Sequence, residues 1–414
     1  MGVQDLERDG LVGAAEGSYE VDGVAARFVA WPRSVSEASQ VLRAAAADGL
    51  AVTFAGGGSK LGLGNPPERA DLVVSTERLD QVLEHAAGDL VVRAQAGVRL
   101  ADLQAALAPA GQWLALDPPE PRATLGGVVA ANASGPRRLR YGTVRDLIIG
   151  TTVVLADGTV AHAGGKVVKN VAGYDLAKLF CGSLGTLGLV AEVIFRLHPL
   201  PAAAAVVTLQ VEGPTQAGQA VQRLGRSTLE PSAAELTLDE GGWPGRLTVV
   251  FEGIQPGVEA QAAAAVQLLG QVGEAAVADP DATDAALGQL GARPFEQAEL
   301  AVKLAHPPSE LPGVLTDLLS VPLGWVVSAH AATGVTWAGG RARHLEQAAA
   351  AIGGLRERLA ARGGSLVLVE GSPELKRAGD VWGPPGDAIG LMRRVKERFD
   401  PDRRLSPGRF VGGI

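Results

Sequence analysis

The sequence predicts an α+β protein with more than one domain. Its 414 residues exceed what a single domain of ordinary size needs. Short apolar runs typical of strands alternate with amphipathic runs typical of helices. The sequence pattern changes after Pro199-Leu200-Pro201. Glycine-rich segments are frequent before this point, whereas predicted strands and helices alternate without them afterwards. The second pattern suits a compact α+β sandwich.

The first 200 residues are expected to form one unit. Helices are expected from Ser36 to about Ala47, with Ser34 or Ser36 as the cap, and from Val98 to Ala108. Asp157-Gly158 suits the tight turn of a hairpin over 153–160. The other strands expected here are 28–31, 51–54, 72–74, 90–94 and 187–197.

The remaining elements follow the same two periodicities, and no internal repeat is evident in the sequence. A linker is expected at 371–386, followed by a final helix at 388–399. The other helices expected after Pro201 are 216–224, 258–269 and 344–362. The strands expected there are 205–211, 234–238, 247–251, 300–304, 325–328, 335–337 and 366–369.

Composition narrows the functional classes. The chain carries 37 basic and 45 acidic residues, a net charge of −8, which argues against nucleic acid as a partner. Cys181 is the single cysteine, so neither an internal disulfide nor a Cys-based zinc or iron–sulfur site is expected. The six histidines lack metal-ligand spacing, so we predict no metal. A polar start and the lack of a long apolar run predict a cytoplasmic protein without a transmembrane segment, with peripheral membrane association through partners left open.

A glycine loop, Gly56-Gly57-Gly58-Ser59-Lys60, directly follows an apolar strand. Glycine permits positive φ, so successive backbone N–H groups can turn inward and hold a pyrophosphate. We expect Gly57 to be needed for this reason. A plain flexible loop is the alternative. Leu61 stands where the dinucleotide fingerprint of a Rossmann fold needs its third glycine, and no Walker loop is present.

Three later segments fit this loop. In Thr124 to Gly135 nearly every side chain is small, so the backbone can lie flush against an extended ligand; tight helix packing is the alternative. Lys169 to Leu176 leads to glycines at 182, 185 and 188, which enter an apolar strand. Pro407-Gly408-Arg409 lies near the end.

Taken together, these motifs resemble a known family. The runs Gly135 to Arg138, Tyr141 to Asp146, Gly164 to Lys166, Lys169 to Leu176 and Gly182 to Gly188 are similar to the FAD-binding E-type subunit of bacterial glycolate oxidases. The resemblance covers about residues 20–200 and the ending 400–409. The wider superfamily is that of PCMH-type, vanillyl-alcohol-oxidase-like FAD-binding proteins.

The resemblance implies a domain plan and a cofactor. Residues 1–200 would form a two-subdomain PCMH-type FAD-binding domain, and 201–372 a smaller α+β (ferredoxin-like) cap domain on the substrate side. Residues 373–414 would return to pack on the FAD domain. FAD would be held non-covalently, since the 55–64 loop offers no histidine tether and Cys181 matches no tether motif. Cys181 is interpreted as a small hydrophobe.

The resemblance also implies a set of binding residues. Residues 56–61 would cradle the pyrophosphate, and 131–134 would continue along the cofactor. Residues 118–124, with Gly126 and Gly127, would line the ribityl chain and ring. Residues 184–190 would face the adenine or the pyrimidine edge. The residues expected to bind FAD are Gly56, Gly57, Gly58, Ser59, Lys60, Leu61, Pro118, Thr124, Gly126, Gly127, Ala131, Asn132, Ala133, Ser134, Gly185, Thr186, Gly188 and Val190.

The catalytic residues stay unknown. Related catalytic subunits resemble proteins with the metal motif H-x-G-D-G-N-x-H, and the nearest stretch here, Ala329 to Val335, keeps one histidine, His330, but lacks the aspartate and the second histidine. His330 is interpreted as structural, with a flavin-side base as the alternative. The sequence favours an FAD-binding oxidoreductase subunit of a glycolate (2-hydroxy acid) oxidase complex, beside a catalytic flavin subunit and an iron–sulfur subunit. The alternatives are a free-standing FAD-dependent 2-hydroxy acid dehydrogenase and a non-catalytic flavin-binding assembly subunit.

Overall fold

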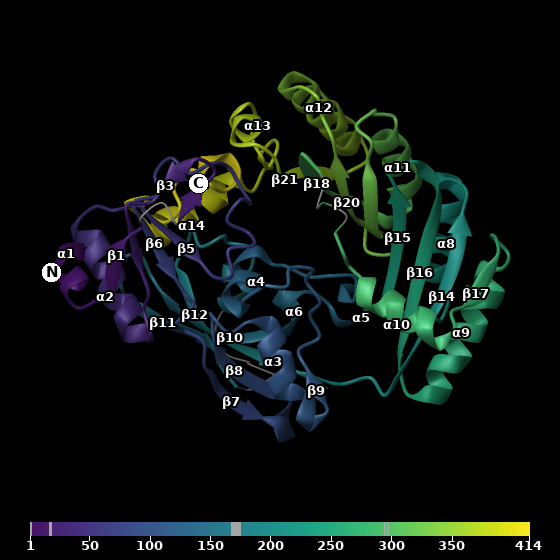
Figure 1. Cartoon of the computed structure of the whole chain (residues 1–414), viewed down its shortest axis with the longest axis horizontal. Helices are drawn as coiled ribbons and strands as arrows, with labels where there is room; N and C mark the ends of the chain where they lie inside the picture. Colours follow the sequence, from purple (N-terminus) through teal and green to yellow (C-terminus); the bar gives the residue numbers. More distant parts are fainter. Residues whose placement is uncertain (1, 16–18, 167–174, 294, 296–297) are drawn as a thin grey trace. The chain divides into compact units, whose positions relative to one another are not determined.

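The structure is a computed structural model that describes residues 2–15, 19–166, 175–293, 295 and 298–414. Its contacts divide the chain into two compact units. The first unit comprises Met1–Ala133, Thr143–Leu200 and Pro384–Ile414; the second comprises Ser134–Gly142 and Pro201–Gly383. Both units combine helices with sheets, so the predicted α+β fold is confirmed (Figure 1).

The first unit contains a four-stranded sheet that leads into the glycine loop. Its order is β1-β4-β6-β5, with β4, β5 and β6 parallel and β1 antiparallel. Apolar side chains of helix α2 pack on this sheet, and the Ser34 hydroxyl accepts the Glu37 N–H at the helix start (3.1 Å). The elements are α1 (Val3–Arg8), β1 (Val12–Ala14), β4 (Phe28–Ala30), α2 (Val35–Ala47), β5 (Val52–Ala55) and β6 (Leu72–Ser75).

A five-stranded antiparallel sheet, ordered β11-β10-β12-β8-β7, follows in the same unit. The predicted hairpin turn is present, with Gly158 at φ 81° between β10 and β11. The strands are β7 (Val82–Ala86), β8 (Val91–Gln95), β10 (Ile148–Val154), β11 (Val160–Gly164) and β12 (Leu189–Arg196). The helices nearby are α3 (Leu100–Leu107), α4 (Leu125–Ala131), α6 (Val144–Leu147) and α7 (Ala177–Phe180).

The chain returns to the first unit at its end. Helix α14 (Ile389–Phe399) leads to Leu405, which forms a parallel bridge with Val52 of β5. Two backbone bonds fix this bridge: Val52 N–H to the Arg404 carbonyl (2.7 Å) and Ser406 N–H to the Val52 carbonyl (2.8 Å). The last segment therefore lies beside the strand that carries the glycine loop (Figure 1). Short pairs β2 (Glu20–Val21) with β3 (Val24–Ala25) and β9 (Gln112–Trp113) with β13 (His198–Pro199), and turns η1 (Ala87–Asp89), η2 (Ala108–Ala110) and η4 (Val411–Gly413), complete this unit.

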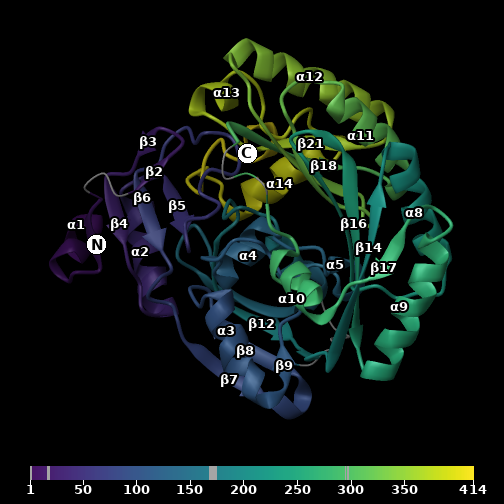
Figure 2. The same ribbon diagram turned by 45° about the vertical axis from the view of Figure 1, so that its right-hand side comes forward.

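The second unit is built on one eight-stranded antiparallel sheet, ordered β17-β14-β16-β15-β19-β20-β18-β21. Helices α8, α9, α11 and α12 cover one face with apolar side chains (Figure 2). Its strands are β14 (Ala203–Val211), β15 (Ala233–Asp239), β16 (Gly242–Gly253), β17 (Ala275–Val277), β18 (Leu300–Ala305), β19 (Val326–His330), β20 (Val335–Gly340) and β21 (Ser365–Glu370). Its helices are α5 (Arg138–Tyr141), α8 (Pro214–Arg226), α9 (Gln255–Leu269), α10 (Pro280–Gln289), η3 (Pro308–Glu310), α11 (Leu311–Leu319), α12 (Leu345–Ala361) and α13 (Pro373–Arg377).

This sheet contains a repeat that the sequence did not reveal. Elements β14 to β17 run β-α-β-β-α-β, and β18 to β21 run in the same order with α11 and α12. The two halves meet where β15 pairs with β19. The expectation of no internal repeat is therefore wrong at the level of structure, because the halves share a topology rather than a residue pattern. The predicted linker at 371–386 is also partly wrong, since it contains helix α13, capped by the Ser372 hydroxyl.

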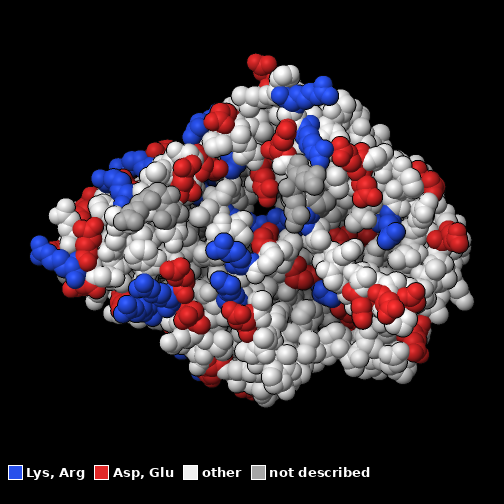
Figure 3. Space-filling model, in the orientation of Figure 1, with Lys and Arg blue, Asp and Glu red and all other residues white. Residues whose placement is uncertain are grey.

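Acidic and basic side chains are interspersed over the face of the molecule that Figure 3 shows. Within the described residues, none of the helices has the length and apolar character needed to cross a membrane.

Candidate FAD-binding site

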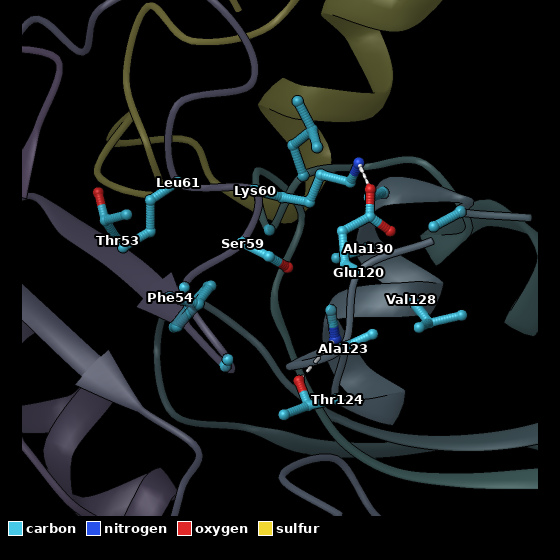
Figure 4. Close-up of a pocket in the computed structure, with 18 of the residues that line it drawn as sticks. Thr53, Phe54, Ser59, Lys60, Leu61, Glu120, Ala123, Thr124, Val128 and Ala130 are labelled. Atoms are coloured by element: carbon cyan, nitrogen blue, oxygen red, sulfur yellow. Dashed lines mark hydrogen bonds and ion pairs between the residues drawn. The ribbon is translucent and has the colours of Figure 1, made fainter. Parts of the chain in front are cut away.

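A cavity in the first unit is lined by the glycine loop, the turn before α4 and α4 itself (Figure 4). Eleven of the residues predicted to bind the cofactor line it: Gly56, Gly57, Gly58, Ser59, Lys60, Leu61, Thr124, Gly127, Ala131, Ala133 and Gly185. The lining also includes Thr53, Phe54, Glu120, Ala123, Val128, Ala130, Leu184 and Arg409, which the predicted set lacked. A polar Thr53 within the apolar run 51–54 is the signal that could have revealed β5 as part of the site.

Close packing explains why the loop needs glycine. A Cβ at Gly57 would overlap the carbonyl oxygen of Arg122, and a Cβ at Gly56 would overlap the Thr124 hydroxyl. Positive φ is found instead at Gly58 (78°). The expectation that Gly57 is required for a positive φ is therefore wrong: Gly57 is required because another backbone segment passes directly over it.

Helix α4 presents a bare surface to the cavity and is fixed at both ends. The Thr124 hydroxyl accepts the Gly127 N–H (3.4 Å) as its N-cap. At the other end, the N–H groups of Gly182 and Leu184 donate to the carbonyls of Val129 and Ala130, both at 2.9 Å. The glycine segment 182–188 thus satisfies carbonyls that a helix end leaves without intrahelical partners.

Seven of the predicted residues do not line this cavity. Ser134 belongs to the second unit. Gly126 packs α4 against the end of β8, because its Cβ position lies 2.7 Å from the Ala96 Cβ. The other five are Pro118, Asn132, Thr186, Gly188 and Val190. The predicted motif segment 169–174 lies outside the described residues.

The residues present fit an extended, flat, anionic cofactor. The glycines leave a cradle that side chains would fill. Two buried polar atoms, Thr53 Oγ1 in the lining and Asn132 Oδ1 at the end of α4, have no hydrogen-bond partner among the described residues. Buried polar atoms without partners are costly unless a ligand supplies the missing bonds.

Comparison with known proteins identifies the cofactor. Residues 26–164 match the family described as FAD binding domain, and residues 384–410 match that of FAD linked oxidases, C-terminal domain. FAD is the cofactor of this chain. The predicted resemblance to PCMH-type FAD-binding proteins is therefore confirmed as far as the FAD-binding domain is concerned.

Three curated relatives are similar over part of their length. An uncharacterized FAD-linked oxidoreductase of Mycobacterium tuberculosis is 40% identical over 172 residues, 42% of this chain and 38% of the relative. Glycolate oxidase subunit GlcD of Bacillus subtilis is 35% identical over 205 residues (49% and 44%). Glycolate oxidase subunit GlcE of Escherichia coli is 39% identical over 161 residues (38% and 45%). The matched part spans less than half of each relative.

Solved structures extend the likeness to the whole fold. p-Cresol methylhydroxylase matches with a TM-score of 0.76 at 14% identity, covering 97% of this chain and 94% of that one. Chitooligosaccharide oxidase matches with a TM-score of 0.69 at 18% identity, covering 97% of both chains. At such identities the likeness concerns the fold alone.

Arg409 anchors the glycine loop at the edge of the FAD cavity. Its guanidinium donates to the carbonyls of Leu61 (2.6 Å) and Leu63 (2.5 Å), and the residue is 4% exposed. Burial lowers the pKa of Arg409 to about 10, with Asp22 acting in the opposite direction. The cation is therefore directed at the main chain of the loop, which it holds from the far end of the sequence.

Lys396 ties a second cavity segment to the same ending. Its buried ammonium donates to the Thr186 carbonyl (2.9 Å), the Leu405 carbonyl (2.8 Å) and the Asp400 carboxylate (2.7 Å). Desolvation lowers the pKa of Lys396, while the Asp400 charge opposes the shift. Asp400 also accepts the N–H groups of Arg404 and Leu405. One buried pair thus connects α14, the 182–188 segment and the strand partner of β5.

The face of the second unit's sheet opposite α8, α9, α11 and α12, on which α10 packs, carries a separate polar region. Buried Glu235 accepts the Ser328 hydroxyl (2.6 Å) and the Gly291 N–H (2.9 Å). His330, 4% exposed, lies beside it with Nδ1 3.8 Å from a Glu235 oxygen. Burial first, and then the charges of Arg138, Arg293 and Lys303, lower the pKa of His330 to about 3, so the ring is neutral.

Two tryptophans of the second unit, Trp325 and Trp337, are buried, and the Arg293 guanidinium lies over the Trp337 ring, 4.0 Å from its centroid. Cys181 is half-buried, and burial raises the pKa of its thiol to about 11, so it is not a reactive thiolate. No group of three or more His, Cys, Asp or Glu side chains in the described part of the chain is arranged to hold a metal.

Proposed function

We propose that this chain is an FAD-binding oxidoreductase subunit of a glycolate (2-hydroxy acid) oxidase complex. The observation that carries the proposal is the glycine-lined cavity, in which Gly57 passes against Arg122 within a region that matches the FAD binding domain family. Similarity to the GlcD and GlcE subunits of glycolate oxidase supports the substrate class and the multi-subunit assembly. The E-type role in particular is part of this proposal.

The proposed binding mode uses main chain more than side chain. Residues Gly56 to Leu61 donate backbone N–H groups to the pyrophosphate, and the bare surface of α4 lies along the ribityl chain and ring. Thr53 Oγ1 and Asn132 Oδ1 supply polar contacts. FAD bound here would supply the two-electron acceptor for oxidation of the substrate. Since no His or Cys is among the described lining residues, we propose non-covalent binding.

A free-standing 2-hydroxy acid dehydrogenase is the second candidate. The cations Arg138, Arg293 and Lys303 act on His330 at the polar face of the second unit, and such a cluster suits a carboxylate. His330 itself is a poor base at neutral pH, because its pKa of about 3 leaves little driving force for proton abstraction.

One experiment separates these candidates. The chain is purified alone and also from its native host with its bound proteins, and flavin absorbance is followed anaerobically after adding glycolate or D-lactate. We expect yellow protein whose FAD is released intact by acid precipitation. We also expect slow bleaching by the chain alone and fast bleaching of a complex that contains a second flavin subunit and an iron–sulfur subunit. Fast bleaching by the isolated chain would overturn the subunit proposal in favour of the dehydrogenase.

A further inference from the structure

Three charged side chains are among the described residues that line the FAD cavity: Lys60, Glu120 and Arg409. The Arg409 guanidinium is directed at the carbonyls of Leu61 and Leu63, just after the glycine loop. Lys60 and Glu120 instead form an ion pair with each other, from segments 60 positions apart in the sequence. Figure 4 shows the Lys60 side chain reaching from the glycine loop to the Glu120 carboxylate.

This ion pair is only slightly accessible to water. The side chains of Lys60 and Glu120 are 18% and 12% exposed. In such a partly desolvated position charges interact more strongly than on the surface, and a carboxylate repels another anion brought close to it. An acidic residue is therefore unexpected in the lining of a cavity that receives a pyrophosphate.

The local backbone explains how the carboxylate comes to be there. The Ala123 N–H donates to the Glu120 carbonyl (3.0 Å), which closes a turn just before α4. The carbonyl of Arg122 in the same turn lies against Gly57. The turn that packs on the glycine loop thus also delivers one negative charge to the cation of that loop.

We propose that Glu120 is a built-in competitor for the cofactor's pyrophosphate: it pairs with Lys60 in the empty protein and gives up that cation when FAD binds. Glu120 then sets how tightly FAD is held, and Lys60 is the cation exchanged between the two anions. The inference rests on the proposed placement of the pyrophosphate at the glycine loop. It goes beyond that placement by assigning a role to an acidic residue that the loop motif does not contain.

The substitution Glu120→Gln tests this exchange, because it removes the charge and keeps the shape. Apoprotein is titrated with FAD, ADP and riboflavin, followed by flavin fluorescence or, for ADP, by calorimetry. We expect Glu120→Gln to tighten FAD and ADP on the order of tenfold, since the carboxylate then neither repels their phosphates nor competes with them for Lys60. Riboflavin, which has no phosphate, is expected to bind as in the wild type. Glu77→Gln, an exposed site in the same unit, is the charge-matched control and is expected to change nothing.

A double-mutant cycle gives the second measurement. Lys60→Met is compared in the wild-type and Glu120→Gln backgrounds, with thermal unfolding of each apoprotein as a check on folding. We expect Lys60→Met to weaken FAD more in the Glu120→Gln background, where Lys60 is available to the phosphate. Equal or weaker FAD binding by folded Glu120→Gln, or equal Lys60→Met effects in both backgrounds, would overturn the exchange. A wild-type chain that takes up no FAD would instead refute the cofactor assignment.

Discussion

The FAD cavity and the polar face of the second unit differ in what forms them: exposed backbone in the cavity, and paired polar side chains on the face. In the cavity, small residues expose the backbone, and two buried cations, Arg409 in its lining and Lys396 behind it, donate to backbone carbonyls of neighbouring segments. On the polar face, buried and half-buried side chains bind one another, as when half-buried Arg137 pairs with buried Glu252 and Ser328 donates to Glu235. The cavity therefore depends on where side chains are missing, whereas the polar face depends on which side chains the sheet brings together.

This difference predicts whether a substitution changes stability alone or both stability and cofactor binding. A buried cation that holds loops contributes through the backbone positions it fixes, so its loss is felt in both stability and cofactor binding. A buried pair within one sheet contributes mainly to the stability of that sheet.

Lys396→Met is expected to have the largest effect. It leaves the Asp400 carboxylate buried without its cation and releases the Thr186 carbonyl, which costs about 3–5 kcal/mol of unfolding free energy. FAD retention falls as well, because the 182–188 segment loses its anchor. Urea unfolding and FAD titration measure the two effects.

Arg398→Met, an exposed cation of the same helix, serves as the control for Lys396→Met and is expected to be nearly neutral. The double variant Lys396→Met/Asp400→Leu removes both buried charges and is expected to recover much of the stability but not the FAD affinity. Recovery of both together would show that Lys396 has no positioning role.

Gly57→Ala is expected to act on the cofactor more than on folding. The added methyl overlaps the Arg122 carbonyl, so the loop must shift, and this shift costs about 1–3 kcal/mol of free energy. This corresponds to roughly 5- to 150-fold weaker FAD binding. The matched control is Gly88→Ala, a first-unit glycine with open space around its Cβ position. If folded Gly57→Ala holds FAD as tightly as Gly88→Ala does, the close approach has no bearing on binding.

These two predictions show why the sequence revealed one region and not the other. A glycine loop after an apolar strand is a local pattern, and eleven of the predicted residues line the cavity. Arg409 was absent from the predicted set because its position depends on a contact with Leu61, 348 positions away in the sequence. Thr53 was absent because its place in the lining depends on the direction of strand β5. Glu235 and Ser328 are 93 positions apart and meet only because β15 pairs with β19.

The same reasoning accounts for the fold. The α+β class and most elements follow from local periodicity, and the Asp157-Gly158 hairpin follows from turn chemistry. The repeat of β-α-β-β-α-β halves in the second unit escaped notice because apolar spacing constrains topology only loosely. The need for glycine at position 57 was predicted, but the reason lies in a tertiary contact with Arg122.

The polar face predicts a pH effect of intermediate size. The folded-state pKa of His330 is about 3, below its ordinary value of 6.5, so the unfolded chain binds an additional proton between these values. Stability is then greatest above pH 6.5 and falls as pH decreases toward 3, by about 2 kcal/mol between pH 7 and pH 5 from this group. His330→Asn is expected to flatten this dependence in urea unfolding at the two pH values. Exposed His344→Asn should leave the slope as it is in the wild type.

Substitutions at two helix caps in the first unit are expected to have smaller effects still. Thr124 caps α4 in the FAD cavity, and Ser34 caps α2 away from the residues that line it. Removing either hydroxyl by substitution with Ala costs about 1 kcal/mol of stability. Only Thr124→Ala should also weaken FAD, because the Thr124 hydroxyl lies against Gly56 and fixes the start of α4 under the cofactor. Thr124→Ser keeps the hydroxyl and should restore both properties. Equal loss of FAD affinity in Ser34→Ala would mean that general destabilisation, rather than the shape of the cavity, controls cofactor retention.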